Sequence, residues 1–160
     1  MNHGGLEETA KQLQAINSNV DVKVYLTDVS QEEEVILAIE GAYRHFHQLD
    51  YVVQSAGLNQ RPRALLHETE MVNFDRVFSV NTRGLYIVQR EAVKRMRGQS
   101  ASQTGQKGSI VNIASISGVQ PTPNLVPVSS VQRAWLAVTR VTLSFTVRRF
   151  KGRCHSLDQG

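Results

Sequence analysis

The chain has 160 residues, of which 41% are hydrophobic, 20% charged and 6% aromatic, and its formal net charge is +4. This length suits one domain, residues 1–160, with a core of its own, and the proportions exclude collagen-like, coiled-coil and disordered classes. A single cysteine, Cys154, excludes an internal disulfide, and no apolar run approaches the roughly 18 residues that a membrane helix needs, so we expect a cytoplasmic protein.

The first half of the chain alternates between helix and strand patterns. Apolar residues at helical spacing predict a helix over residues 6–16, and the alternation through Val20–Leu26 predicts a strand. Ser30 and Glu33 form an S-x-x-E capping box, which predicts that a helix opens there and runs to about His47.

The second half continues this alternation. A short apolar strand is predicted around Leu49–Val53, and a long helix over Phe74–Met96. The segment Gly98–Gly108 is polar and rich in small residues, which is typical of a loop. A strand at Ser109–Ile113 and a helix over residues 129–145 follow. Strands separated by helices of this length indicate right-handed β-α-β units, so the fold class is α/β, with a parallel sheet covered on both faces.

The end of the chain carries the excess positive charge. Residues 128–160 hold six basic side chains and one acidic side chain. Such an end can indicate a phosphate-bearing partner such as a nucleic acid. A solvated helix face followed by an irregular end explains the charge more simply, and we favour that interpretation.

Polar groups follow the predicted strands or lie beside them. Asp28-Val29 and Ser55-Ala56-Gly57 each follow a strand, Asn81 lies on the apolar face of the long helix, and Ser115 follows a third strand. Ligands of open α/β sheets bind beyond the carboxyl ends of the strands, so these groups are expected on one rim. Each also has an ordinary explanation: Asp28 can cap the loop before Ser30, and Asn81 can cap or kink a helix. Their joint order and spacing favour a binding site.

In these features the sequence resembles the short-chain dehydrogenase/reductase family, over essentially the whole chain. The resemblance implies hydride transfer between NAD or NADP, bound on a Rossmann fold, and a small-molecule carbonyl or secondary alcohol. It implies that Asp28 contacts the adenine with Val29 beside it, and that Ser55-Ala56-Gly57 lines the cofactor. It also implies that Asn81 holds a water of the proton relay and that Ser115 hydrogen-bonds the substrate carbonyl.

The sequence departs from the family pattern at the catalytic pair. The family has a tyrosine thirteen residues after the serine and a lysine four residues further on, where this chain has Val128 and Gln132. The tyrosine exchanges the proton that accompanies hydride transfer, and the lysine lowers the pKa of the phenol. Because valine and glutamine can do neither, we expect weak or no dehydrogenase activity.

Parts of the family's sheet also have no counterpart in this sequence. The family opens with a strand and a glycine-rich turn that cradles the pyrophosphate, and Gly4-Gly5 is not that motif. With the family's strand order 3-2-1-4-5-6, two missing strands would lie between Val20–Leu26 and Leu49–Val53. We therefore expect a partial Rossmann fold, a doubly wound parallel sheet without the first βαβ unit and the last strand, in which NAD(P) binding is impaired.

Three interpretations of function stay open. The chain is a weak or inactive oxidoreductase, a catalytically silent pseudo-member, or a non-functional remnant of a truncated gene. A pseudo-member would pair with an intact relative, as a homo- or hetero-oligomer through the helices predicted over residues 74–96 and 129–145. Membrane and nucleic-acid partners rank last. We expect no metal site, because His45 and His47 are two apart on a helix and point in different directions.

Overall fold

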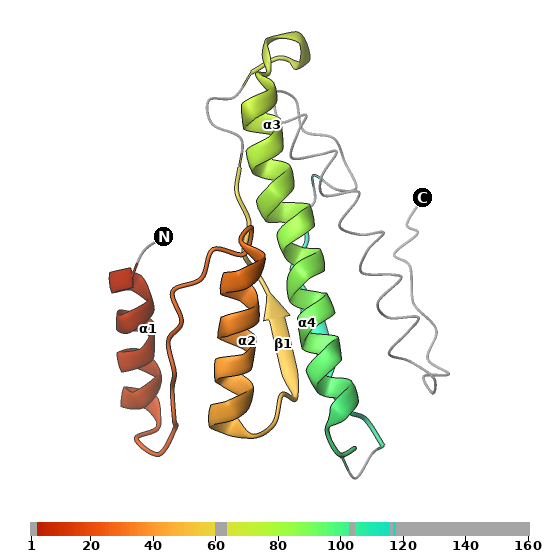
Figure 1. The fold of residues 1–160 in the computed structure, drawn as a ribbon. Helices are drawn as coiled ribbons and strands as arrows, with labels where there is room; N and C mark the ends of the chain where they lie inside the picture. Colours follow the sequence, from red (N-terminus) through yellow and green to blue (C-terminus); the bar gives the residue numbers. More distant parts are fainter. Residues whose placement is uncertain (1–2, 60–63, 103–104, 116, 118–160) are drawn as a thin grey trace, which may run out of the picture.

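Helices dominate the part of the chain that the structure describes. The structure is a computed structural model, and it describes residues 3–59, 64–102, 105–115 and 117. Figure 1 shows α2 and α4 standing in front of the sheet, with α1 at the edge of the molecule. The elements are, in chain order, α1 (His3–Ile16), α2 (Glu32–Phe46), β1 (Tyr51–Gln54), η1 (Leu66–Glu68), α3 (Met71–Phe78), η2 (Ser79–Gly84), α4 (Leu85–Gly98) and β2 (Ser109–Asn112).

Two parallel strands form the sheet. β1 pairs with β2 so that Gln54 lies opposite Asn112. The pairing extends beyond the strand ends, because the Ser109 N–H donates to the Asp50 carbonyl at 2.8 Å and the Ile113 N–H to the Gln54 carbonyl at 2.9 Å. Helices connect the two strands, as a parallel pair requires. The α/β class is confirmed, and the strands predicted at Leu49–Val53 and Ser109–Ile113 are confirmed within two residues at either end.

The long predicted helix is confirmed, with a change of pitch inside it. α3, η2 and α4 form one helical run from Met71 to Gly98, and the middle segment Ser79–Gly84 is a π-helix. The buried face of α4 contains Leu85, Ile87, Ala92 and Met96. α4 packs against α2, whose buried residue is Val35. Short π segments inside α-helices are frequent at functional sites, and this one contains Asn81.

The strand predicted over Val20–Leu26 is wrong. These residues form no strand and pair with none of the described strands. Side chains tie the segment to α2 instead: Asp21 forms an ion pair with His45, and the Tyr25 ring covers Gly41. A β-strand exists only with a hydrogen-bonded neighbour, so an alternating pattern cannot become one where no partner lies alongside it.

A cavity of about 460 Å³ separates this segment from β1. The resemblance to the family predicts two further strands at this place. Helices α1 and α2 contribute to the walls as well, so the space lies between helices and two extended stretches of chain. Its apolar lining includes Leu6, Leu13, Val22, Val24, Ile39 and Val52. The sheet of the described residues is therefore a partial Rossmann sheet of two strands.

The capping box predicted for α2 is also wrong. The helix begins at Glu32, its N-cap residue Gln31 makes no side-chain cap, and the Ser30 hydroxyl donates to Asp28 instead. Three consecutive glutamates, Glu32 to Glu34, fill the first turn, where carboxylates interact favourably with the helix dipole. The helix ends at Phe46, and His47 takes the left-handed conformation with φ of 60°.

Several sequence predictions lie outside the described residues. These are the helix over residues 129–145, the pair Val128 and Gln132, and Cys154. In the described ranges, no helix is both long and apolar enough to cross a lipid bilayer.

Candidate functional site

The Asp28 turn is held by hydrogen bonds of its own. The backbone N–H and the hydroxyl of Ser30 donate to Asp28 Oδ1 at 2.9 and 2.8 Å. The Asp28 N–H in turn donates to Glu34 Oε2 at 2.7 Å. The two bonds from Ser30 lower the pKa of the Asp28 carboxyl below its ordinary value, so it is ionised at neutral pH. One carboxylate oxygen orders the turn, and the capping role considered for Asp28 is present.

The small-residue turn after β1 is clamped by Asn81. Asn81 is 1% exposed, and its amide makes both kinds of hydrogen bond with the backbone of Leu58. Oδ1 accepts from the Leu58 N–H at 2.7 Å, and Nδ2 donates to the Leu58 carbonyl at 2.9 Å. A Cβ on Gly57 would lie 3.5 Å from Asn81 Oδ1. The π-helical segment therefore holds the end of the Ser55-Ala56-Gly57 turn.

The same helical segment reaches the Asp28 turn through Gly84. A Cβ at Gly84 would lie 2.9 Å from both the carbonyl oxygen and Cγ2 of Val29. Only a residue without a side chain allows this approach without displacement. The two candidate cofactor turns thus meet at η2, one at Asn81 and the other at Gly84.

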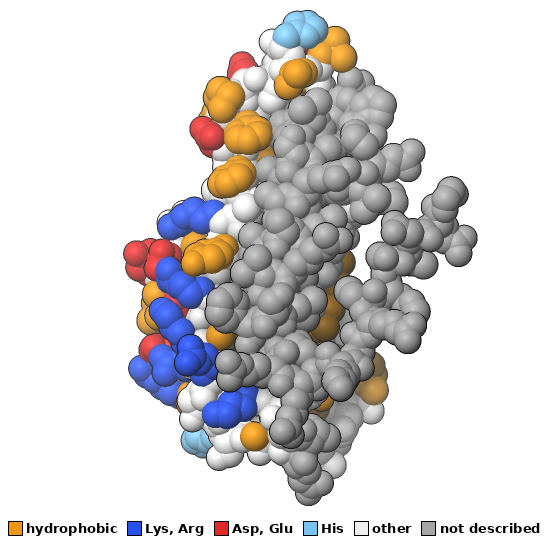
Figure 2. Space-filling view, turned by 90° about the vertical axis from the view of Figure 1, so that its right-hand side faces the viewer, with side chains coloured by type: hydrophobic (Ala, Val, Ile, Leu, Met, Phe, Trp, Pro, Cys, Tyr) orange, Lys and Arg blue, Asp and Glu red, His pale blue; other side chains and the backbone are white. Residues whose placement is uncertain are grey.

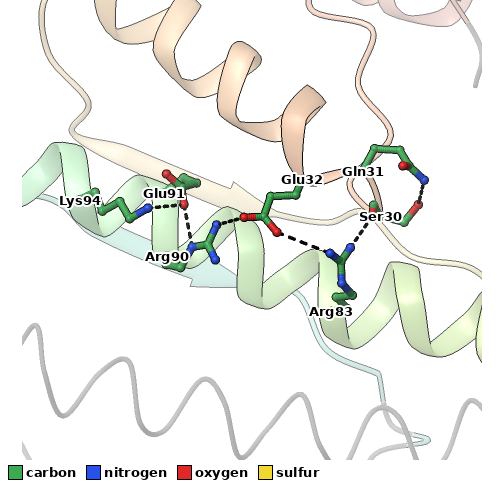
Figure 3. A network of polar contacts seen from close by, with 7 residues as sticks. All are labelled: Ser30, Gln31, Glu32, Arg83, Arg90, Glu91 and Lys94. Carbon is green, nitrogen blue, oxygen red and sulfur yellow. Dashed lines mark hydrogen bonds and ion pairs between the residues drawn. The ribbon is translucent and has the colours of Figure 1, made fainter.

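Charged side chains join the start of α2 to the helical run (Figure 3). Arg90 Nη2 forms an ion pair with Glu32 Oε1, and Arg83 Nη2 lies 3.5 Å from Glu32 Oε2. The hydrogen bond from Arg90 lowers the pKa of Glu32. Burial tends to raise the pKa of Glu91, but hydrogen bonds from Lys94 and Arg90, both at 2.7 Å, outweigh it and leave that pKa lowered. All four carboxylate–cation contacts favour the charged forms.

Ser115 lies three residues beyond β2. Because β1 and β2 are parallel neighbours, it follows a strand end at the same edge of the sheet as Ser55-Ala56-Gly57. Its hydroxyl accepts a hydrogen bond from the Ser117 N–H at 3.2 Å. No described contact joins Ser115 to Asn81 or to the Asp28 turn.

The structure brings most of the predicted cofactor residues together. Val29, Ser55 and Ala56 line the same cavity, and Gly57 lies against Asn81. Sequence reasoning did not single out the residues that connect η2 and α4 to the Asp28 turn and the start of α2, which are Gly84, Arg83, Glu32 and Arg90. A glycine inside a helical pattern was the available signal for Gly84. Nothing local marks Arg83, because its partner Ser30 is 53 residues away.

The described residues include candidates for only one part of NAD(P). Val29, Ser55 and Ala56 line one cavity with Gln54, whose Nε2 is buried and has no hydrogen-bond partner among the described residues. Asp28 keeps a second carboxylate oxygen. For the pyrophosphate the described residues offer no glycine-rich turn between a strand and a helix, since Gly4-Gly5 lies inside the first turn of α1. The candidate residues are those that the family resemblance assigns to the adenosine end.

The amino-acid sequence matches a known family model. The model described as short chain dehydrogenase matches residues 1–144. Short-chain dehydrogenase srdC of Neurospora crassa is 30% identical over 135 residues, which make up 79% of this chain and 50% of that protein. The chain thus spans about half the length of the curated relatives it matches.

Solved structures share the fold. NAD⁺-bound xylitol dehydrogenase superimposes with a TM-score of 0.81 at 27% identity, over 91% of this chain and 53% of that one. ElxO with NADP bound gives a TM-score of 0.72 at 28% identity, over 87% of this chain and 54% of that one. Both neighbours carry a nicotinamide nucleotide.

Proposed function

This chain belongs to the short-chain dehydrogenase family, and from that membership we propose that it is an oxidoreductase scaffold with weak or no turnover of its own. The proposed reaction is hydride transfer between NAD or NADP and a carbonyl or secondary alcohol. One structural observation carries the proposal. The single segment η2 holds both candidate cofactor turns, through Asn81 on Leu58 and Gly84 on Val29.

The proposed site has a cofactor side and a substrate side. On the cofactor side, Asp28 and Val29 contact the adenine, and Ser55, Ala56 and Gly57 line the nucleotide; when bound, NAD(P) supplies or accepts the hydride. Support comes from the contacts by which η2 holds both turns, Asn81 with Leu58 and Gly84 with Val29. On the substrate side, Ser115 donates a hydrogen bond to the carbonyl oxygen and Asn81 orders a water.

Proton transfer is the step affected by Val128 and Gln132, which stand where the family has its tyrosine and lysine. Reduction of a carbonyl adds a hydride to carbon and a proton to oxygen, and both must arrive. The Ser115 hydroxyl can polarise the oxygen, but it does not release its proton at neutral pH. Val128 has no exchangeable proton and Gln132 carries no charge. Loss of a general acid typically costs about 10²–10⁴-fold in rate.

Restoring the pair tests this proposal. We expect Val128→Tyr with Gln132→Lys to reduce a simple ketone at least about 100-fold faster than the natural chain, because the variant regains a general acid of lowered pKa. The measurement is NADH and NADPH oxidation by the purified proteins, with Val128→Phe and Gln132→Met as a variant of similar bulk without the proton or the charge. Equal turnover in all three proteins would contradict the role of these positions. Undetectable turnover in all of them would contradict the oxidoreductase proposal.

A second candidate is a catalytically silent subunit that pairs with an intact relative. Exposed apolar side chains just before the helix 74–96 and in its first turns favour it, since contiguous exposed apolar surface often marks an interaction site. Figure 2 shows hydrophobic side chains over the upper part of one face, where Figure 1 places α3. We propose the helices 74–96 and 129–145 as the interface, and co-purification with a full-length family member tests it. Failure to co-purify would contradict this candidate. The exposed residues are Leu65, Leu66, Met71, Val72 and Phe78.

We propose the cytoplasm as the location of this protein. One cysteine in 160 residues is typical of proteins of reducing compartments and supports this choice.

A further inference from the structure

The start of α2 is held by a residue from another element. Its N-cap residue, Gln31, makes no side-chain hydrogen bond to the helix. Arg83 instead reaches across from η2: its Nη1 donates to the Ser30 carbonyl at 2.6 Å, and its Nη2 lies 3.5 Å from Glu32 Oε2. One guanidinium therefore bridges the last residue of the Asp28 turn and the first residue of the helix (Figure 3).

This contact acts on the same turn that Asp28 orders from within. The N–H and the hydroxyl of Ser30 both donate to Asp28 Oδ1, and the Ser30 carbonyl accepts a hydrogen bond from Arg83 Nη1. The Gln31 N–H donates to the Asp28 carbonyl at 2.9 Å and closes the turn. If Arg83 releases Ser30, the turn keeps its internal bonds and the packing of Val29 against Gly84, but it loses its hydrogen bond to η2, the segment that also clamps Leu58.

We propose that Arg83 is a positioning residue, which fixes the Asp28 turn relative to η2 and thereby sets the affinity for the adenosine end of a nicotinamide nucleotide. The inference rests on the function proposed above. It adds a residue that touches no cofactor itself and acts through Ser30 and Glu32.

Arginine suits this role because its planar fork can serve two acceptors at once. A lysine at position 83 offers a point charge and can satisfy either the Ser30 carbonyl or the Glu32 carboxylate, but it does not reproduce the paired geometry. The Arg83 side chain is 50% exposed, so each contact is screened and the expected effect is moderate. Arg90 holds the other oxygen of Glu32, so α2 stays attached to α4 when Arg83 is changed.

Hydrogen exchange of the full chain tests the positioning. We expect Arg83→Gln to speed exchange of the backbone amides of Asp28, Ser30 and Gln31 by about three- to tenfold, and Arg83→Lys to restore part of the protection. The Ile113 amide, which bonds to Gln54 in the sheet, should not change. Arg76→Gln is the matched control, because Arg76 is an exposed arginine on α3 outside the network of Figure 3.

Exchange rates at Asp28, Ser30 and Gln31 that are equal in Arg83→Gln and Arg76→Gln would overturn the inference. A rise in exchange that includes Ile113 would overturn it too, because it would show general destabilisation. Fluorescence titration with NADH then measures affinity, and we expect a Kd several-fold higher in Arg83→Gln than in the natural chain. An unchanged Kd overturns the link to affinity. If the natural chain binds no NADH, the proposed function and that link both fail, while the positioning of the turn is still decided by exchange alone.

Discussion

At the scale of single residues, the two candidate cofactor turns depend on atoms that approach the helix closely. Gly84 permits the contact with Val29, and the Asn81 amide satisfies both backbone groups of Leu58. A buried amide that loses its partners costs about 1–3 kcal/mol, so Asn81 has a structural role whatever its part in catalysis. Asp28 is similar, because Ser30 uses one of its oxygens before any ligand binds.

Gly84→Ala tests the close approach. The added Cβ would lie 2.9 Å from the Val29 carbonyl oxygen, a backbone atom that cannot move aside cheaply. We expect a loss of about 1–3 kcal/mol in the free energy of unfolding, measured by urea denaturation.

Gly98→Ala is the matched control, because nothing lies within 4 Å of a Cβ at that position of α4. Alanine is the better helix former, so this variant should be neutral or up to about 1 kcal/mol more stable. Equal losses in the two variants would show that Val29 does not restrict position 84.

At the scale of elements, the Glu32 carboxylate joins α2 to the helical run through Arg83 and Arg90, and Arg90 also contacts Glu91 on its own helix. Glu32 has a lowered pKa because of its hydrogen bond from Arg90, and Glu91 has one because Lys94 and Arg90 outweigh the effect of burial. A group whose pKa is lower in the folded than in the unfolded chain adds stability above its unfolded pKa. That contribution is lost as the pH falls through the folded value.

Acid should therefore weaken this helix contact. We expect Glu32→Gln to unfold at a lower temperature than the natural chain at pH 7, and the difference to shrink once the pH falls below the ordinary glutamate pKa of 4.5. Thermal unfolding followed by circular dichroism from pH 7 to pH 3 measures it.

Glu33→Gln removes the same charge from the same helical turn, but Glu33 is exposed and lies outside the network of Figure 3. Its effect at pH 7 should be the smaller of the two. A gap between Glu32→Gln and the natural chain that stays constant down to pH 3 would contradict the ion-pair explanation.

At the scale of the whole molecule, β1 pairs with β2, and no other strand of the described residues pairs with its second edge. Tyr51 and Val53 are 77% and 65% exposed on this strand. Unpaired apolar edges tend to pair with other chains. The cavity between β1 and the segment Val20–Leu26 leaves the same edge accessible.

We expect the isolated chain to self-associate with increasing concentration, and Val53→Lys to reduce this, because an edge lysine opposes strand pairing. Light scattering coupled to size-exclusion chromatography gives the mass. Leu37→Lys is the control, since it places the same charge on an equally exposed apolar position of α2, where Leu37 is 68% exposed. If both variants reduce association equally, general surface hydrophobicity and not the strand edge is responsible.

The sequence by itself determined the order and type of most elements and the fold family. Helical periodicity and short apolar runs are local properties, and they located α1, α2, β1, the long helical run and β2. The chain order of Asp28, Ser55-Ala56-Gly57, Asn81 and Ser115 indicated the family that the whole-sequence match then showed.

Only the tertiary structure decided which groups meet. Val20–Leu26 has a strand pattern but pairs with no strand of the described residues, and ladder hydrogen bonds depend on a second segment and not on the pattern itself. The Ser30 hydroxyl could cap a helix or donate to Asp28, and in the structure it donates to Asp28. Arg83, 53 residues away, donates to the Ser30 carbonyl in this arrangement. Gly84 is an unremarkable helix residue in the sequence and becomes a close contact only where Val29 packs against it. Partners brought together by folding, and not local spacing, determine these choices.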